Sequence, residues 1–458
     1  MGSFDGLSVA LSALYAQRRG LDVTGQNIAN ANTEGYSRQR VTLESVGAPN
    51  TPAIFAQSTV AGGGVQATGI ERLRDAFLET RAQIGHAQLS ELSAKTNVVT
   101  QIEQLFPEPS DRGLQAHLSD FWASLHDVAN QPDSLSARAQ LLQRATIVSD
   151  WLNQASASLS AQSSSATTDL STLVLQANDA ASRLAELNQG ILQGSQAGLP
   201  INELQDQRDK LAMTLAESVG GTTLTDPDGT VGVYIGGSAV VRGNRAEALQ
   251  LATSAGTVQL QWARDNSPVA VSGGKANALL DAVNTVIPSW SAQLDGVAAA
   301  LASQVNAVHV NGYDLNGIQG VAFFSGASAA SIKVVITDPK LIAASLIAPS
   351  GGNISLDGGN ADALAILGDA STSPDAIYNQ MIVSLGISSQ SASGRLNTQN
   401  AIVSNIDGAR ASDSGVSLDE EMTQLLTYQR AYEAASRVLT AVDSALDTLV
   451  NRTGLVGR

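Results

Sequence analysis

Val416-Ser417-Leu418-Asp419-Glu420-Glu421-Met422 opens a run that reaches Arg452 without a proline or a glycine. Large side chains recur every seven residues along it, at Leu418, Leu425, Tyr432, Leu439 and Leu446. This spacing predicts an amphipathic helix with one apolar edge, about 50 Å long at roughly 1.5 Å per residue. A single helix cannot bury that edge against itself, so the helix needs a partner.

The start of this helix carries the pattern of a capping box. Ser417 precedes the first apolar residue and Glu420 follows three positions later, so we expect the two to cap the helix. Asp419 and Glu421 add negative charge to the first turn, where the helix dipole favours it. Capping therefore accounts for the neighbouring carboxylates Glu420 and Glu421 without a catalytic role. The alternate seam positions are mixed in character, which leaves only half of the seam strongly apolar: Met422, Gln429, Ser436, Asp443 and Val450.

A second stripe with the same repeat lies at the N-terminus, within a helix predicted over residues 5–31. Its apolar residues are Leu7, Leu11, Leu14, Leu21 and Ile28, while Arg18 and Gly25 weaken the intervening positions. Two terminal helices with a seven-residue repeat predict coiled-coil packing between the ends of the chain. Because both seams are weak, they suit helices that become ordered only when many subunits pack together. The Asn- and Gly-rich residues 27–38 predict the end of the first helix and a turn.

Composition limits the class of protein. The 458 residues suffice for two to four domains, and aromatic residues make up only 4% of them, as in a core of packed long helices. The chain contains no cysteine, which excludes disulfides and thiolate metal sites. A net charge of −16 disfavours binding to nucleic acid or an anionic membrane. We expect neither a cleavable secretory signal nor a membrane-spanning segment, since no continuous apolar run follows a cationic N-terminus.

Between the termini the spacing of apolar residues is first typical of helices, then alternates as in β-strands, and then becomes helical again. Residues 38–69 read as extended, with a turn point at Gly62-Gly63-Gly64. Helices are predicted over residues 71–106, 113–130, 135–193 and 202–219. The Ser- and Ala-rich residues 155–168 are either part of one long helix or a break between two, and we favour continuity because they contain neither proline nor glycine. Short strands are predicted over residues 222–225, 231–235, 239–242 and 257–263, with a turn at residues 226–229. Helical patterning resumes over residues 275–310, with a break or kink at Pro288, and over residues 375–412; residues 311–373 are mixed, with a strand over residues 332–337.

The predicted fold is mainly α with an inserted small antiparallel β domain. The terminal helices would pair as an α-helical coiled coil beside a long-helix bundle domain. The expected domains are a terminal coiled-coil assembly domain (1–45 and 413–458), a long-helix domain with some strand (46–220 and 275–412), and the β insert (221–274).

No constellation of residues with the chemistry of an active site stands out. The histidines His86, His117, His126 and His309 are scattered, and solvated or core roles are the expectation for each. Gly273-Gly274-Lys275-Ala276 lacks the Ser or Thr and the first glycine of a phosphate loop. Asp314-Leu315-Asn316-Gly317 lacks the later ligands of a calcium loop and predicts a turn. We therefore assign no catalytic, cofactor-binding or metal-binding residue and expect no cofactor.

Both termini carry motifs of a known family. The N-terminal residues are Asn27-Ile28-Ala29-Asn30, Asn32-Thr33, Gly35-Tyr36 and Arg38. The C-terminal ones are Leu418-Asp419-Glu420-Glu421-Met422, Tyr428-Gln429-Arg430-Ala431-Tyr432 and Leu446-Asp447-Thr448-Leu449-Val450-Asn451-Arg452. Together they resemble the axial proteins of the bacterial flagellum, the rod, hook and hook-associated family. Residues 202–211, Phe323-Phe324 and residues 334–339 resemble the members that join hook to filament, although residues 221–274 match in pattern only, and an outer domain of longer members is missing.

The resemblance implies a structural, non-enzymatic subunit that leaves the cell by type III export and is secreted to the hook–filament junction. Expected partners are further copies of the chain in a ring or tube, hook protein, hook-associated protein 3 and, before secretion, an export chaperone. The expected assembly-interface residues are Leu7, Leu11, Leu14, Leu21, Asn27, Ile28, Asn30, Asn32, Thr33, Gly35, Tyr36, Arg38, Leu418, Met422, Leu425, Tyr432, Leu439, Leu446 and Leu449.

Two alternatives remain open at this point. A hook or distal rod protein of the same family would share the terminal motifs but should lack the helix that carries Asp206 and Asp209. An enzyme or glycan-binding module in residues 221–274 would require a polar pocket with convergent titratable groups, which the sequence does not show.

Overall fold

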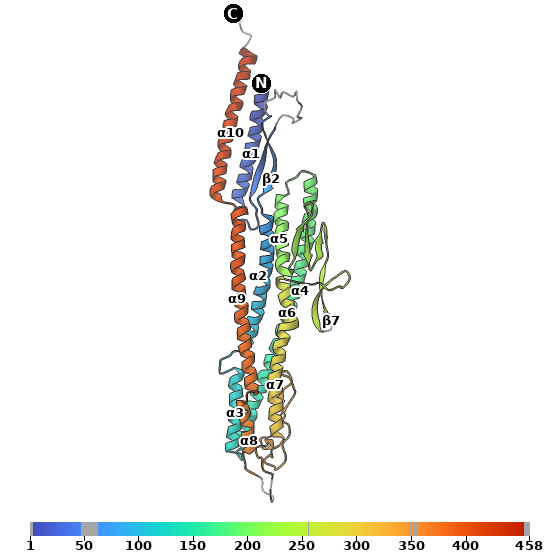
Figure 1. Cartoon of the computed structure of the whole chain (residues 1–458), viewed down its shortest axis with the longest axis vertical. Helices are drawn as coiled ribbons and strands as arrows, with labels where there is room; N and C mark the ends of the chain where they lie inside the picture. Colours follow the sequence, from blue (N-terminus) through green and yellow to red (C-terminus); the bar gives the residue numbers. More distant parts are fainter. Residues whose placement is uncertain (1–2, 47–62, 255, 349, 351–354, 453–458) are drawn as a thin grey trace.

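The chain forms a long, narrow molecule built mostly of helices that run along its length (Figure 1). The computed structural model describes residues 3–46, 63–254, 256–348, 350 and 355–452. Within these residues no helix is both long and apolar enough to cross a membrane. The mainly α architecture with small antiparallel sheets agrees with the predicted fold class.

One end of the molecule consists of the two terminal helices and a β-hairpin. Helix α1 (Ser3–Ala29) lies antiparallel beside α10 (Leu418–Asp447), which continues as the π-helical segment η4 (Thr448–Arg452) (Figure 1). Strands β1 (Gln39–Ser45) and β2 (Val65–Arg72) pair antiparallel and pack against α1. The predicted extended segment is thus a hairpin, of which residues 47–62, including the predicted turn residue Gly62, lie outside the described part.

Two long antiparallel helices connect this end with the rest of the molecule. Helix α2 (Ala76–Leu105) packs along α9 (Pro374–Ser414) (Figure 1). Our predicted start for α2 at residue 71 is wrong, because the preceding residues belong to β2 and pair with β1. The helix begins after Asp75, whose carboxylate accepts hydrogen bonds from the backbone N–H of Phe77 and Leu78 at 2.7 and 3.1 Å.

Helix α4 (Leu135–Gln196) is one continuous helix of 62 residues. Its Ser- and Ala-rich middle keeps a buried stripe at Ala155, Leu159, Ala166 and Leu170. The helix runs through this stretch without interruption, so the predicted continuity is confirmed. Helix α3 (Leu114–Asn130) packs beside its start and α5 (Asn202–Val219) beside its end.

The β strands that follow α5 form two small antiparallel sheets against α4. Strands β3 (Thr222–Thr225), β4 (Val231–Ile235), β5 (Ser238–Arg242) and β6 (Arg245–Ala246) pair in sequence order. Strands β7 (Leu249–Ser254) and β8 (Thr257–Trp262) form a separate hairpin. The prediction located β3, β4, β5 and β8 but missed β6 and β7. The core beneath the strands joins Val233, Val240 and Trp262 to Leu173 of α4.

The helix after the strands changes its winding instead of breaking. Helix α6 (Gly274–Asp281) passes through the π-helical segment η1 (Ala282–Val286) into α7 (Ile287–His309). Pro288 lies at the start of α7. Proline supplies no backbone N–H and so cannot make the usual helical hydrogen bond. The helix accommodates it with a wider, π-helical turn directly before it. The predicted irregularity at Pro288 is therefore a π-helical segment.

The opposite end of the molecule holds an aromatic cluster, in which Phe121, Phe323, Phe324 and Tyr378 are fully buried. Around it lie short elements: β9 (Phe324–Ser325), β10 (Lys333–Val334), the 3-10 helices η2 (Pro339–Leu341) and η3 (Ile366–Asp369), and α8 (Gly359–Ala365). The strand predicted over residues 332–337 is wrong beyond β10, because pairing with β9 lasts for two residues. Asp314 forms the predicted turn, accepting from the backbone N–H of Asn316 and Ile318 at 2.8 Å each.

Candidate assembly site

The terminal helices meet in a narrow seam of small residues. A Cβ atom added at Gly20 would lie 2.6 Å from Cε1 of Tyr428, and one added at Gly6 would lie 3.8 Å from Cγ2 of Val442. One heptad further along the seam, the Nδ2 of Asn27 donates to Oε2 of Glu421 at 2.9 Å. Seven residues forward on α1 thus correspond to seven residues back on α10, which is an antiparallel heptad register.

This register corrects the predicted pairing of one leucine stripe with the other. The α10 side of the seam runs through Glu421, Tyr428, Ala435 and Val442, of which Glu421 and Ala435 are the buried residues of α10. The side chains of α1 that are most buried are small or polar: Ala10, Ala16, Val23, Thr24 and Asn27. Glycine and alanine let the two backbones approach closely, so the large leucines are turned to the flanks of the contact.

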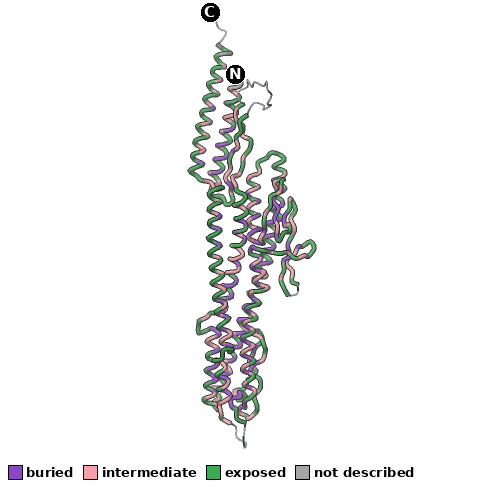
Figure 2. The backbone as a smooth tube through the Cα atoms, in the orientation of Figure 1, coloured by how far each residue is buried: buried purple, intermediate pink, exposed green. Residues whose placement is uncertain are grey.

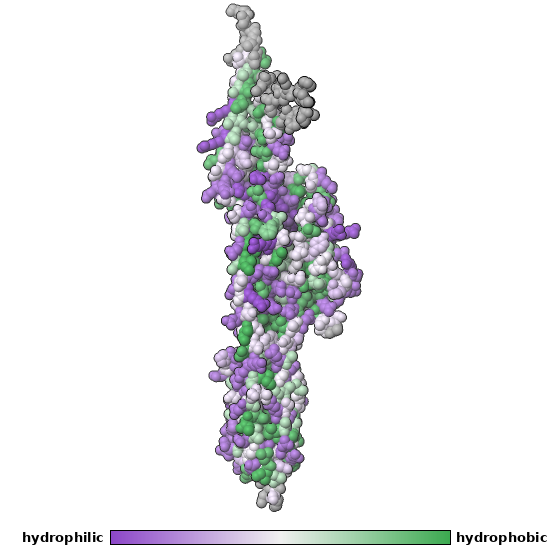
Figure 3. Space-filling model, in the orientation of Figure 1, coloured by the Kyte–Doolittle hydropathy of each residue, from purple (hydrophilic) through white to green (hydrophobic). Residues whose placement is uncertain are grey.

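Many predicted interface residues therefore remain open to solvent in one chain. Leu11 is 42% exposed, and on α10 Leu418, Met422 and Tyr432 are 51%, 50% and 38% exposed. The other predicted stripe residues are half-buried: Leu7, Leu14, Leu21, Ile28, Leu425, Leu439 and Leu446. The side chain of Leu449 lies outside the described part. Figure 2 shows that exposed residues predominate along α10, whereas α1 alternates between buried and exposed residues, and Figure 3 shows apolar side chains among polar ones on their visible face.

The N-terminal motif is organised around the amide of Asn27, which is 1% exposed. Its Oδ1 accepts from Oη of Tyr36 at 2.8 Å and from the backbone N–H of Gln39 at 3.0 Å. Its Nδ2 donates to the backbone carbonyl of Gln39 and to Glu421, each at 2.9 Å. All four hydrogen-bonding positions of this amide are used, so it fixes the chain as it leaves α1 and enters β1.

The remaining motif residues shape the turn between α1 and β1. Asn30 donates to the backbone carbonyl of Gln26 at 3.0 Å and accepts from the Thr33 hydroxyl at 3.2 Å. Gly35 has a φ of 84°, a conformation that favours glycine, as the predicted turn requires. Asn32, Thr33 and Gly35 are exposed, whereas Tyr36 is half-buried. Burial, with the nearby charges of Asp206 and Glu421, raises the pKa of Tyr36 to about 12.

The two terminal motifs meet at Glu421, whose side chain is fully buried. Its Oε1 accepts from Nε of Arg38 at 2.7 Å, and Nη1 of the same guanidinium donates to Oε2 of Glu420 at 2.7 Å. The predicted capping box is wrong: Ser417 makes no side-chain capping bond, and Glu420 pairs with Arg38 instead. The carboxylate of Glu420 binds the guanidinium of Arg38, from the other terminus, instead of the backbone N–H at the start of α10.

Beneath these motifs, α5 fastens the terminal segment to the body of the molecule. Asp206 accepts from the backbone N–H and hydroxyl of Ser37 at 3.2 and 2.9 Å, and from Nη1 of Arg72 at 2.7 Å. Asp209 accepts from the same Arg72 nitrogen at 2.9 Å and also pairs with Arg74. We call this cluster of Ser37, Arg72, Arg74, Asp206 and Asp209 the joint. The resemblance drew attention to the two aspartates, but no local pattern indicated that they bind segments more than 130 residues away.

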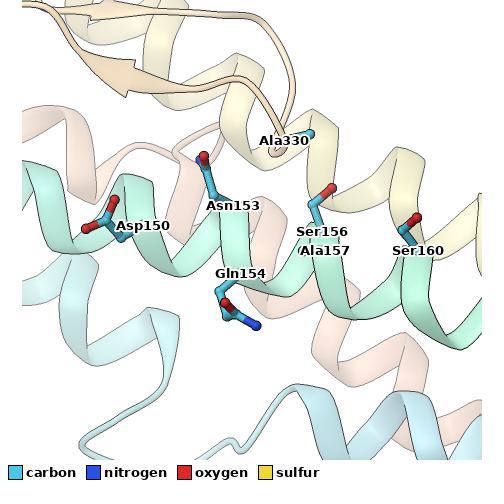
Figure 4. A pocket seen from close by; sticks show the side chains of 7 residues that line it. All are labelled: Asp150, Asn153, Gln154, Ser156, Ala157, Ser160 and Ala330. Carbon is cyan, nitrogen blue, oxygen red and sulfur yellow. The ribbon is translucent and has the colours of Figure 1, made fainter.

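A hollow and a buried histidine lie elsewhere in the described residues. An open hollow of about 750 Å³ runs along α4 (Figure 4), lined by Asp150, Asn153, Gln154, Ser156, Ala157, Ser160 and Ala330. The amide of Asn153 is already engaged, since it donates to the carbonyls of Ala329 and Ile332 at 3.0 Å each. His309 is a core residue whose Nδ1 lies 2.6 Å from the carbonyl of Val321, and burial lowers its pKa. Among the described residues, no group of three or more His, Cys, Asp or Glu side chains could hold a metal ion.

The fold and the site define a class of protein, an elongated helical subunit whose two termini form one paired-helix element. Comparison with known proteins gives the particular family. The family model described as "Flagellar hook-associated protein FlgK helical domain" matches residues 99–324. The model "Flagella basal body rod protein" matches residues 7–36, and "Flagellar basal body rod FlgEFG protein C-terminal" matches residues 410–452.

Similar whole proteins agree with these matches. Flagellar hook-associated protein 1 of Bacillus subtilis is 32% identical over 510 residues, covering 100% of this chain and 99% of that protein. The protein of the same name from Salmonella typhimurium is 27% identical over 333 residues, which cover 69% of this chain and 58% of that protein. The chain therefore belongs to the flagellar hook-associated protein 1 family and is a structural component of the bacterial flagellum.

A solved structure shares the fold. The flagellar hook junction protein FlgK from Burkholderia pseudomallei superposes with a TM-score of 0.65 at 16% sequence identity. The match covers 73% of this chain and 100% of that one.

Proposed function

We propose that this chain is the subunit that joins hook to filament, and that it assembles through its paired terminal helices. The observation that carries the proposal is the outward position of large apolar residues on α1 and α10, including Leu11, Leu418 and Met422. Burial of large apolar side chains stabilises an assembly by about 1.5–3 kcal/mol each, and one chain alone leaves this stabilisation unused. Neighbouring copies of the chain are the surfaces that would cover them.

The proposed domains follow from this role. Residues 1–45 and 413–458 form the assembly domain, and residues 46–220 with 275–412 form the long-helix domain around it. The β insert, residues 221–274, faces outward from the long helices. In the assembled flagellum the stripe residues predicted from the sequence, from Leu7 to Ile28 and from Leu418 to Leu449, line contacts between copies.

The partners and the location complete the proposal. The chain crosses the cell envelope through the type III export channel, with a chaperone bound beforehand, and becomes part of the extracellular flagellum. There it contacts hook protein on one side and hook-associated protein 3 on the other. The role is structural and involves no catalysis and no cofactor.

The match to the hook-associated helical domain favours this role over that of a hook or distal rod protein. The Asp206–Asp209 helix, which a hook or rod protein should lack, is present as α5. For a catalytic or glycan-binding β insert, the discriminating feature would be a polar pocket in residues 221–274. The hollow along α4 and a second one between α2 and α9, lined by residues that include Leu92, Gly394 and Thr398, lie outside that insert.

The test is the replacement of Met422 by aspartate in a strain whose own copy of the gene is deleted. Met422→Asp places a charge on the exposed stripe of α10, so we expect loss of filament attachment and of swimming. The matched control is Thr423→Asp, which adds the same charge one residue along the helix and about 100° around it. Filaments attached at normal frequency in the Met422→Asp strain, with the variant located at the distal end of the hook, would contradict assembly through this stripe.

The folded state of the variant is checked on the purified subunit. Because Met422 is half exposed in one chain, Met422→Asp should leave helix content and tryptophan fluorescence unchanged. Fluorescent labelling of the wild-type chain tests the location separately. A signal spread along the filament or at the cell body would contradict the junction role even if the stripe proves essential.

A further inference from the structure

The ion pairs of the joint continue along α2 and α9 to a histidine. Arg74 donates to Oε2 of Glu79 at 2.7 Å, and Arg410 of α9 donates to the same oxygen at 2.9 Å. Arg410 also reaches Oδ1 of Asp407 at 3.3 Å. The carboxylate of Asp407 in turn lies 3.1 Å from Nε2 of His86. The series thus runs without interruption from the joint into the long helices.

His86 is the meeting point of helices α2, α5 and α9. Its Nε2 faces Asp407 of α9, while its Nδ1 lies 3.2 Å from Oε1 of Glu217, near the end of α5. A neutral imidazole has one N–H and can donate to only one carboxylate, whereas the imidazolium has two. A carboxylate lies at each ring nitrogen, so only the doubly protonated ring can donate a hydrogen bond to both of them.

The balance of charges in the ion-pair network that joins the joint to His86 also favours a protonated His86. Its carboxylates are Asp206, Asp209, Glu79, Asp407 and Glu217, and its guanidinium groups are those of Arg72, Arg74, Arg208 and Arg410. The carboxylates outnumber the guanidinium groups by one, and His86 supplies the missing positive charge when it is protonated. The other charged contact recorded for α2 in this region, Lys95 with Asp281 of α6, is self-contained and two and a half turns away.

We propose that His86 is a proton-dependent clamp that holds α5 and α9 against α2 just beyond the joint. When the proton leaves, one of the two hydrogen bonds is lost, and Glu217 and Asp407 face a neutral ring. The packing of α5 and α9 on α2 then weakens on the side that supports the terminal helices. This clamp belongs to the single chain, so it holds or fails independently of the proposed place of the protein in the flagellum.

The direction of the pH dependence follows from the surroundings of the ring. The hydrogen bond to Glu217 raises the pKa of His86 above 6.5, Asp407 raises it further, and partial burial opposes them. The folded-state pKa therefore lies above the unfolded one. The stabilisation is fully present below the unfolded pKa of about 6.5 and is lost as the pH rises through the raised folded value. His86 is 22% exposed and its partners about 40%, so water screens part of the effect.

The direct test is an NMR titration of the full-length chain labelled with ¹³C at histidine Cε1, with signals assigned by His→Gln variants. The reference is the same chain unfolded in urea. We expect His86 to titrate at a higher pH in the folded chain than in the unfolded one. In the double variant Glu217→Gln/Asp407→Asn, both hydrogen-bonding shapes remain but the charges are gone, so the folded-state midpoint of His86 should fall to the unfolded one or below. A folded wild-type His86 that titrates with the unfolded chain or at lower pH would overturn the clamp.

Thermal unfolding tests the consequence for the fold. His86→Gln should lower Tm at about pH 5.5 by a shift on the order of 2–4 °C, and the difference from wild type should close by about pH 9. His126→Gln serves as the matched control, since it removes a half-exposed histidine with one carboxylate at 3.8 Å, and it should lower Tm by less than His86→Gln at about pH 5.5. An equal Tm difference at both pH values would mean that His86 contributes packing alone, which also contradicts the proposal.

Discussion

The two ends of the molecule are stabilised in different ways. At the end that holds α3 and α8, large side chains such as Phe121, Leu125 and Tyr378 are completely buried by their own chain. At the other end, the buried residues of α10 are Glu421 and Ala435, and large apolar residues such as Met422 lie outside. One end therefore has an apolar core of its own, whereas the other is held by what we call the polar lock, the hydrogen bonds of Asn27 and Arg38 to Glu421. We expect this second end to gain apolar contacts on assembly.

The largest effect should come from the self-contained end. Phe121→Ala removes a ring that contacts Trp122, Phe323 and Phe324, with centroid distances of 4.8 to 6.2 Å. Loss of a fully buried phenylalanine costs about 3–5 kcal/mol, measurable by urea unfolding. Phe77→Ala is the matched control, since Phe77 is 71% exposed and its loss should change stability by less than about 0.5 kcal/mol. Equal losses for both variants would remove the contrast between core and surface.

A smaller effect is expected at the polar lock between the termini. Arg38→Met keeps the length of the side chain but leaves the buried Glu421 without its cation, which costs about 3 kcal/mol in local stability. Hydrogen exchange should show faster opening of α10 and of the β1–β2 hairpin, with α3 and α4 unchanged. Glu420→Gln is the control, because Glu420 is 61% exposed and its pair with Arg38 contributes at most about 1 kcal/mol. Unchanged exchange in α10 of Arg38→Met would show that the lock does not hold the pair.

The smallest effect concerns the seam itself and is recognised by its sign. Gly20→Ala would press its Cβ against the ring of Tyr428, whereas a Cβ at Gly25 meets nothing within 4 Å. We expect Gly20→Ala to destabilise α1 by about 1 kcal/mol after the gain in helix propensity is subtracted, and Gly25→Ala to stabilise it by about 0.5–1 kcal/mol. Circular dichroism during thermal unfolding measures both. Stabilisation by Gly20→Ala would contradict the antiparallel register.

Much of the architecture was predictable because helix boundaries carry strong local signals. The prolines at positions 107 and 109 follow α2, and α5, β3 and β4 begin and end at the predicted residues, while β5 and β8 each differ by one residue. The start of α2 was misplaced because the strand residues before it join the helical pattern without a turn signal. The hairpin strand β7 was missed because it is short and has turns on both sides, so its alternation of apolar and polar residues resembles a loop.

The site was less predictable than the fold. Apolar periodicity is recognised by large side chains, so it predicted a contact through Leu7 to Ile28. The observed seam runs through Gly6, Gly20 and Asn27, which such a pattern does not include. The bond from Asn27 to Glu421 joins residues 394 positions apart, and no local pattern contains it. The resemblance identified both motifs by their residue types. The structure shows why the two motifs occur together, because Asn27 and Arg38 of the N-terminal motif bind Glu421 of the C-terminal motif.

Assembly through the terminal helices is tested most directly by hydrogen exchange of α10 in the isolated subunit and in the assembled flagellum. We expect amides of Leu418–Asp447 to exchange much faster than those of α4 in the isolated chain and to become as protected as α4 after assembly. Protection of α10 equal to that of α4 in the dilute monomer, with no gain on assembly, would contradict it.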